Sequence, residues 1–118
     1  MNDFILKSYQ IESTYSLNPK QQRIGLVGTG NLGANIGRRL KETGYNIHMV
    51  YDYDPDRAYV ISSEFECDFT RSLKEISEKC DIVFTLAKNG EQLKDVYYNK
   101  GDNLLMAAKK TIFASTSQ

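Results

Sequence analysis

Three glycines in the stretch GLVGTGNLGANIG constrain the fold of this chain more than any other feature. Gly28, Gly30 and Gly33 form the pattern G-x-G-x-x-G directly after the apolar run RIGLV. A short apolar run that ends in glycine is typical of a buried strand. In the segment that follows, NLGANIGRRLKETG, apolar residues recur at helical spacing up to a glycine that suits a helix end. The sequence therefore predicts a strand, a tight turn and a helix in that order.

The rest of the chain repeats this alternation. We expect further strands over residues 46–52, 66–69, 81–86 and 111–115, and helices over 54–65, 72–80, 89–99 and 102–110. Asp54 is expected to cap the first of these helices, and Ser72 with Glu75 to form a capping box. Alternating strands and helices predict a parallel sheet covered on both faces. Right-handed crossovers then give a Rossmann-type, doubly wound α/β fold of about five strands.

Length and composition fit one globular domain. The chain has 118 residues, of which 41% are apolar and 25% charged, and residues 1–22 differ in composition from the rest. We therefore expect an N-terminal arm over 1–22 and one domain over 23–118. The zero net charge argues against a nucleic-acid partner, and no apolar run approaches membrane-spanning length. Without a signal peptide, a cytoplasmic location is expected, with Cys67 and Cys80 as free thiols and no metal site at His48.

The glycine pattern has a specific chemical reading because it lies between a strand and a helix. The first glycine permits the turn, the second lets a pyrophosphate approach the backbone, and the third lets helix and strand pack closely. Free N–H groups at the start of the helix can then bind phosphate oxygens. The residues expected to contact a dinucleotide cofactor here are Gly28, Thr29, Gly30, Asn31, Leu32 and Gly33.

Asp52 ends the second expected strand at roughly the 20-residue spacing at which an acid binds the adenine ribose in such folds. A carboxylate at that position repels a 2′-phosphate, so NAD is favoured over NADP. The next residue, Tyr53, is not an arginine that could pair with this phosphate. Arg57 lies one helical turn further on and could reach it, which leaves NADP open.

Residues 23–118 resemble the N-terminal half of the β-hydroxyacid dehydrogenases, the family of 3-hydroxyisobutyrate and 6-phosphogluconate dehydrogenases. The stretches IGLVGTGNLGANIGRRLKETGY, YDYDPDRA, CDIVFTLAKN and LLMAAKKTIFASTS carry the resemblance. It implies that the loop after the fourth strand, with Ala87, Lys88 and then Gln92, contacts the cofactor. Thr116 is the best match to the family's Ser/Thr group near the nicotinamide, although the Asp-Met before it is absent here.

The resemblance also implies what a working enzyme of this family requires. Its catalytic lysine lies in an all-helical second domain, which also shapes the substrate pocket and the dimer, and these 118 residues contain no counterpart. We therefore expect a dinucleotide-binding domain that is incomplete for catalysis, with a homodimer or a missing catalytic domain as its partner. The fifth strand is expected at a sheet edge, covered by the arm or by a second copy.

Three alternatives stay open. The chain could be a non-catalytic nucleotide-sensing or protein-interaction module with this fold. It could belong to another oxidoreductase lineage with a similar first half, such as prephenate dehydrogenase or pyrroline-5-carboxylate reductase. It could also be a degenerate domain that binds no ligand, against which the intact glycine loop argues.

Overall fold

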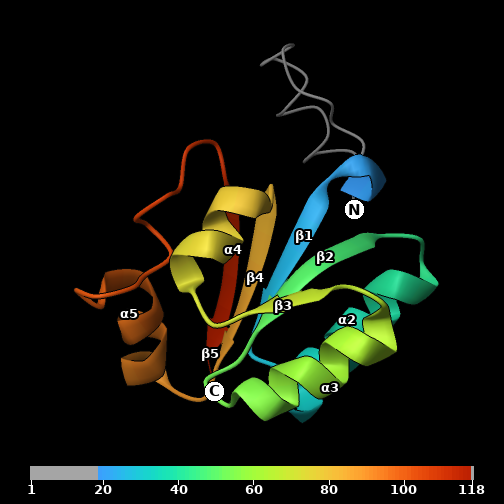
Figure 1. Ribbon diagram of the computed structural model, residues 1–118, viewed down its shortest axis with the longest axis horizontal. Helices are drawn as coiled ribbons and strands as arrows, with labels where there is room; N and C mark the ends of the chain where they lie inside the picture. Colours follow the sequence, from blue (N-terminus) through green and yellow to red (C-terminus); the bar gives the residue numbers. More distant parts are fainter. Residues whose placement is uncertain (1–18, 118) are drawn as a thin grey trace.

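The computed structural model, which describes residues 19–117, is a five-stranded parallel sheet in the order β3-β2-β1-β4-β5 (Figure 1). This order confirms the expected doubly wound α/β fold. The elements are η1 (Pro19–Gln21), β1 (Arg23–Val27), α2 (Asn31–Glu42), β2 (Asn46–Tyr51), α3 (Pro55–Phe65), β3 (Asp68–Thr70), α4 (Leu73–Lys79), β4 (Ile82–Ala87), α5 (Gly90–Tyr98) and β5 (Ile112–Ser117).

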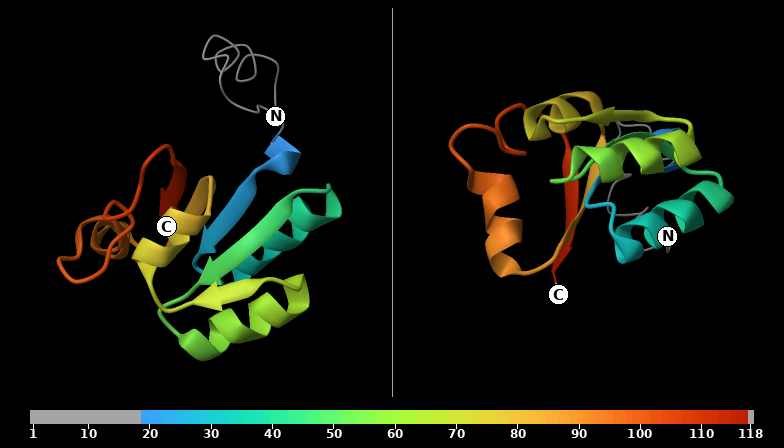
Figure 2. Two further views of the ribbon diagram at one scale, coloured as in Figure 1. Left: turned by 45° about the horizontal axis from the view of Figure 1, so that its top comes forward. Right: turned by 60° about the horizontal axis from the view of Figure 1, so that its bottom comes forward.

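The helices divide between the two faces of the sheet. Helices α2 and α3 pack on one face, and α4 and α5 on the other (Figure 2). Successive strand residues point to opposite layers, so Leu26 is buried under α2 and α3 while Val27 is buried in the other layer. Because both faces are covered, the central strands read as continuous apolar runs rather than as alternating ones.

The local signals at the helix ends are largely confirmed. The Asp54 carboxylate accepts a hydrogen bond from the Asp56 N–H at 3.0 Å, and α3 begins at Pro55. The Ser72 hydroxyl accepts from the Glu75 N–H at 3.2 Å. The Ser72 N–H donates to the Thr70 hydroxyl, so the reciprocal half of the expected capping box is absent from the described hydrogen bonds.

The helix expected over residues 102–110 is wrong, because this segment forms turns. The Asp102 carboxylate instead caps α4, accepting from the Ser72 hydroxyl and from the N–H groups of Leu73 and Lys74 at 2.7–3.0 Å. Leu104 is fully buried in the core below α4 and α5. These tertiary contacts stabilise the turns more than helix propensity stabilises a helix.

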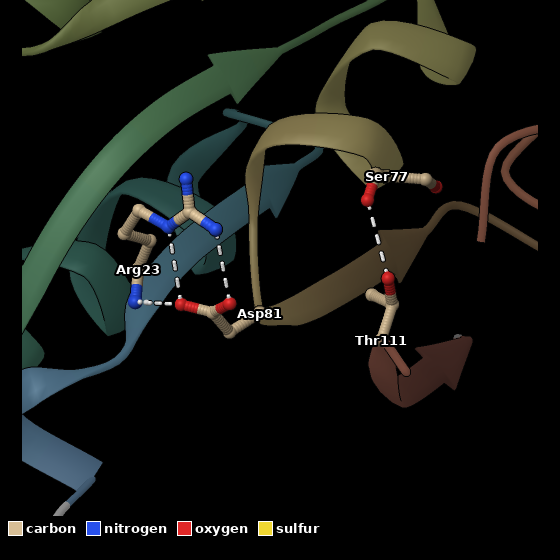
Figure 3. A network of polar contacts seen from close by, with 4 residues as sticks. All are labelled: Arg23, Ser77, Asp81 and Thr111. Carbon is tan, nitrogen blue, oxygen red and sulfur yellow. Dashed lines mark hydrogen bonds and ion pairs between the residues drawn. The ribbon is translucent and has the colours of Figure 1, made fainter. Parts of the chain in front are cut away.

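At the amino-terminal end of the sheet, polar side chains join neighbouring elements (Figure 3). The Asp81 carboxylate, just before β4, accepts hydrogen bonds from the N–H, Nε and Nη2 of Arg23 on β1 at 2.8, 3.2 and 3.1 Å. These bonds lower the pKa of Asp81 below its usual value. The Thr111 hydroxyl donates to the Ser77 carbonyl oxygen at 3.1 Å, which fixes the start of β5 to α4.

Strand β5 lies at one edge of the sheet, and within residues 19–117 it pairs only with β4. The arm that we expect over residues 1–22 falls outside the described residues, apart from Pro19–Gln22. Its proposed cover of the β5 edge therefore stays a prediction. No helix within residues 19–117 is long and apolar enough to cross a membrane.

Candidate functional site

A cleft of about 740 Å³ opens at the carboxyl ends of β1, β2 and β4. This is the point where the chain order reverses, because β1 is followed by β2 on one side and lies beside β4 on the other. Ligands of doubly wound sheets bind at this switch point. Of the residues expected from the sequence, the cleft is lined by Gly28, Gly30, Asn31, Leu32, Gly33, Asp52, Tyr53, Ala87, Lys88 and Gln92.

Two glycines of the loop are required by the fold itself. Gly28 has a φ of +101°, and a Cβ there would lie 2.3 Å from the Leu86 carbonyl oxygen. A Cβ on Gly33 would lie 2.0 Å from the carbonyl oxygen of Gly28. The backbone of β4 therefore lies too close for a side chain at Gly28, and the β1 turn lies too close for one at Gly33.

Gly30 is different, because nothing in the described protein requires a glycine there. Its φ is −68°, a value that any residue adopts, and its ψ is −170°. A Cβ at Gly30 would meet no atom nearer than Nη1 of Arg57, at 3.9 Å. Since Gly30 lines the cleft, its missing side chain leaves free space where a ligand can approach the backbone.

The start of α2 is also open. Among the α-helices of residues 19–117, α3, α4 and α5 are capped by the side chains of Asp54, Ser72 and Asn89, whereas no side chain caps α2 at Gly30. The first N–H groups of an α-helix have no partner inside the helix and carry its positive dipole end. The loop and the first turn of α2 thus form a cradle suited to an anion.

Asp52 supports this loop from behind. Its side chain is largely buried, with the residue 9% exposed, and one carboxylate oxygen accepts from the N–H and hydroxyl of Thr29 at 2.7 and 2.9 Å. The other oxygen accepts from the Asp54 N–H at 2.9 Å. Protein donors therefore occupy three of the roughly four acceptor positions of a carboxylate. Thr29 itself is buried behind the loop and is not part of the cleft lining.

Tyr53 stands at the rim of the cleft and is linked to the opposite side. Its hydroxyl donates to the Asp95 carboxylate of α5 at 2.8 Å. Burial and this hydrogen bond raise the pKa of Tyr53, while the Asn99 amide and the Tyr53 hydroxyl lower the pKa of Asp95. At neutral pH the pair is thus a phenol and a carboxylate. The sequence carries no motif that indicates Asp95.

The loop after β4 is fixed by its own side chains. The Gln92 amide oxygen accepts from the Lys88 N–H at 2.6 Å, and the Gln92 N–H donates to the Asn89 side chain at 2.9 Å. Gln92 therefore holds the loop as well as lining the cleft. The Thr116 backbone pairs with Leu86 in the sheet, but its side chain lies outside the described residues, so its expected role stays a prediction.

Two further residues line the cleft: Thr85, which the sequence does not indicate, and Arg57, which it indicates only as a possible partner of a 2′-phosphate. Thr85 is 1% exposed, and its hydroxyl is the one buried side-chain oxygen or nitrogen of residues 19–117 without a hydrogen-bond partner. Arg57 also lines the cleft, and no carboxylate within the same residues pairs with it. A buried unpaired hydroxyl costs stability, and no pattern in the sequence distinguishes Thr85 from other strand residues.

The described part of the chain offers little for other chemistry. Across residues 19–117, no three His, Cys, Asp or Glu side chains come together as a metal-binding group. Cys67 and Cys80 are free, and burial raises their pKa values to about 11 and about 12. Both thiols are therefore protonated at neutral pH, which makes neither a ready nucleophile.

Comparisons with known proteins agree with this site. Residues 23–118 match the model of the NAD binding domain of 6-phosphogluconate dehydrogenase. The chain is 27% identical over 99 residues to an L-threonate dehydrogenase of Cupriavidus necator, covering 81% of this chain and 32% of that protein. It is 29% identical over 77 residues to pyrroline-5-carboxylate reductase of Escherichia coli, covering 63% and 29%.

A solved structure gives the same relationship. The 3-hydroxyisobutyrate dehydrogenase of Mycobacterium tuberculosis superposes with a TM-score of 0.69 at 27% identity, covering 81% of this chain and 31% of that one. The chain thus spans about a third of the length of these relatives. With the matched model covering most of its length, the chain belongs to the family of NAD-binding domains of 6-phosphogluconate dehydrogenase, which includes the cofactor domains of 3-hydroxyisobutyrate dehydrogenase-like oxidoreductases.

Proposed function

We propose that the cleft binds NAD or NADH in preference to NADP or NADPH. We further propose that the chain serves as the cofactor half of a hydroxyacid dehydrogenase-like oxidoreductase. Gly30 carries the proposal, because the fold leaves space at this position that no described residue fills. The uncapped start of α2 beside it supplies N–H donors for a pyrophosphate. Such a cradle fits a dinucleotide better than an uncharged ligand.

The residues of the cleft have distinct tasks in this proposal. The loop and the first turn of α2 bind the pyrophosphate, and Asp52 holds the loop in position through Thr29. The one free acceptor position of Asp52 can meet a ribose hydroxyl. Bound NAD would supply a hydride acceptor, as it does in oxidoreductases generally. Substrate binding and proton transfer are assigned to protein outside this chain, because the relatives are about three times as long.

The preference for NAD rests on the charges at the β2 end of the cleft. The Asp52 carboxylate lies there and the Asp95 carboxylate stands close by, bonded to Tyr53. Two negative groups disfavour a 2′-phosphate. Arg57 is the nearby cation that could offset them.

Calorimetric titration of the purified chain with NAD, NADH, NADP and NADPH tests the proposal, with Gly30→Ala as the critical variant. We expect NAD and NADH to bind more tightly than their phosphorylated forms. Gly30→Ala should weaken binding by about a hundredfold, the worth of one or two charge-assisted hydrogen bonds. Its free energy of unfolding should fall by only about 1 kcal/mol, because alanine fits the φ of Gly30 and the remaining cost is that of a poorer N-cap.

Gly90→Ala is the matched control, because a Cβ there meets nothing within 4 Å and Gly90 does not line the cleft. This variant should bind as the parent does. Failure of the folded parent to bind any of the four dinucleotides contradicts the proposal. Tighter binding of NADP that depends on Arg57 contradicts the preference for NAD.

A further inference from the structure

The hydrogen bond between Tyr53 and Asp95 joins two parts of the molecule that face each other across the cleft. Tyr53 follows Asp52 directly at the end of β2, and Asp95 lies on α5, which follows β4. Tyr53 lines the cleft, whereas Asp95 is exposed and is not part of the lining. The bond therefore fixes a lining side chain from the far side of the opening.

This end of the cleft is where the adenosine half of a dinucleotide would lie. In doubly wound folds the pyrophosphate sits at the first helix and the acid after the second strand meets the adenine ribose. Tyr53 is next to that acid in sequence. Beside the charged groups at this end, the lining includes the Tyr51 ring and Val96 of α5, which offer apolar surface to a flat base.

The Tyr53 ring is held at two points although the residue is 47% exposed. It packs against the Tyr51 ring in a T-shaped contact, with ring centroids 5.9 Å apart and an angle of 71° between the ring planes. Its hydroxyl is held by Asp95, whose second carboxylate oxygen accepts from the Asn99 side chain at 3.1 Å. An exposed ring fixed in this way has lost its rotamer freedom before any ligand binds.

We propose that Asp95 is a positioning residue for the adenine base, because it holds the Tyr53 ring in place as a stacking wall at the adenosine end of the cleft. This inference rests on the proposed dinucleotide function. Stacking of an aromatic ring on a base contributes to affinity through the flat face that every base presents. Asp95 acts only through Tyr53 and makes no contact with the ligand itself.

Titration with ADP-ribose, which contains the adenosine half and the pyrophosphate, tests the pair by a double-mutant cycle. Tyr53→Phe keeps the ring and removes its hydroxyl, and should weaken ADP-ribose binding about fivefold, the worth of one net hydrogen bond. Asp95→Ala should cause a similar loss. The double variant should bind no more weakly than either single variant, because both remove the same contact.

Asp95→Asn should restore binding to within about twofold of the parent, since its amide oxygen can still accept the Tyr53 hydrogen bond. If Asp95→Ala weakened binding only because a negative charge was lost or because the protein was less stable, Asp95→Asn would not restore the affinity. Tyr98→Phe and Glu78→Gln are matched controls, because both side chains are exposed and neither lines the cleft. Both should bind ADP-ribose as the parent does, and thermal unfolding of each variant confirms that it is folded.

The outcomes separate this inference from the proposed function. If the parent binds ADP-ribose and Gly30→Ala does not, the dinucleotide function stands whatever Tyr53→Phe does. Within that result, unchanged or tighter binding by Tyr53→Phe overturns the positioning role, as do additive losses in the double variant. If the folded parent binds neither ADP-ribose nor NAD, the function and the inference both fall.

Discussion

Polar groups have hydrogen-bond partners at one end of the sheet, whereas several at the other end have none among residues 19–117. At the amino-terminal end, Asp81 and Arg23 satisfy each other and Thr111 donates to a backbone carbonyl (Figure 3). At the carboxyl end, the start of α2 has no side-chain cap and the Thr85 hydroxyl has no partner among residues 19–117. Unpaired polar groups lower the free energy of unfolding. The hydrogen bonds at the amino-terminal end therefore offset part of the destabilisation that arises at the cleft end.

The same contrast separates two carboxylates that both accept backbone N–H groups next to a strand. Asp81 faces a guanidinium at the sheet end, and its side chain is about one-third exposed. Asp52 is buried and faces only neutral donors, all from the loop and from the segment after β2. The first carboxylate stabilises the sheet, while the second fixes the shape of the loop. Chemically identical groups thus stabilise the sheet at one end and fix the shape of the glycine loop at the other.

The largest effect that tests this contrast is expected at Gly33. Gly33→Ala places a Cβ 2.0 Å from the Gly28 carbonyl oxygen, so α2 must move away from β1. We expect a loss of about 3 kcal/mol in the free energy of unfolding, at the upper end of overpacking effects. Urea unfolding measures this loss, and Gly30→Ala in the same loop is the control. Equal stability of the two variants contradicts the distinction between a glycine needed by the fold and one needed by the ligand.

A smaller difference is expected between two buried hydroxyls. Ser77 donates to the Leu104 carbonyl oxygen at 2.5 Å, whereas Thr85 has no described partner. Ser77→Ala should lower the free energy of unfolding by about 1–3 kcal/mol, because it leaves a buried carbonyl unpaired. Thr85→Val should leave stability unchanged or raise it by about 1 kcal/mol, since it removes an unpaired polar atom. A clear loss of stability in Thr85→Val shows that its hydroxyl has a partner in the free protein.

The smallest effect is expected at Asp81, whose pKa the Arg23 hydrogen bonds lower in the folded state. A carboxyl with a lowered folded pKa adds stability above its unfolded pKa, and this contribution is lost as the pH falls through the folded pKa. Because the side chains are 49% and 35% exposed, Asp81→Asn should cost only about 0.5 kcal/mol at pH 7. The difference from the parent should shrink as the pH falls below the usual aspartate range and through the lowered pKa of Asp81.

Unfolding in urea between pH 7 and pH 3 checks this pH dependence, with Glu78→Gln as the control for a lost exposed charge. Dinucleotide affinity at pH 7 should be unchanged by Asp81→Asn, because the pair lies at the end opposite the cleft. A drop in affinity contradicts the division of tasks between the two ends.

The parts of the fold that the sequence predicts are those governed by local patterns. The turn at Gly28, the cap at Asp54 and the buried strands follow from backbone sterics, capping and hydrophobic patterning. The segment over residues 102–110 could not be predicted, because Asp102 and Leu104 are held by α4 and the core, far away in the sequence. Tertiary contacts of this kind override helix propensity.

The site divides in the same way. The glycine loop and Asp52 are recognisable because their spacing along the chain reflects the geometry of a strand–turn–helix unit. The Asp52 contact with Thr29 and the bond from Tyr53 to Asp95 depend on side-chain directions that only the folded chain sets. The same holds for Thr85, because its lack of a hydrogen-bond partner is visible only in the folded structure.

The bonds from Asp52 to Thr29 have a consequence for the thermodynamics of binding. They order the glycine loop when the chain folds, so the entropy of fixing that loop is lost in folding and not again when a ligand arrives. A dinucleotide then meets a surface that is already in its binding shape, and association resembles the docking of two rigid bodies. Loosening the loop by Asp52→Ala should therefore make binding entropically more costly even where every phosphate contact is eventually formed.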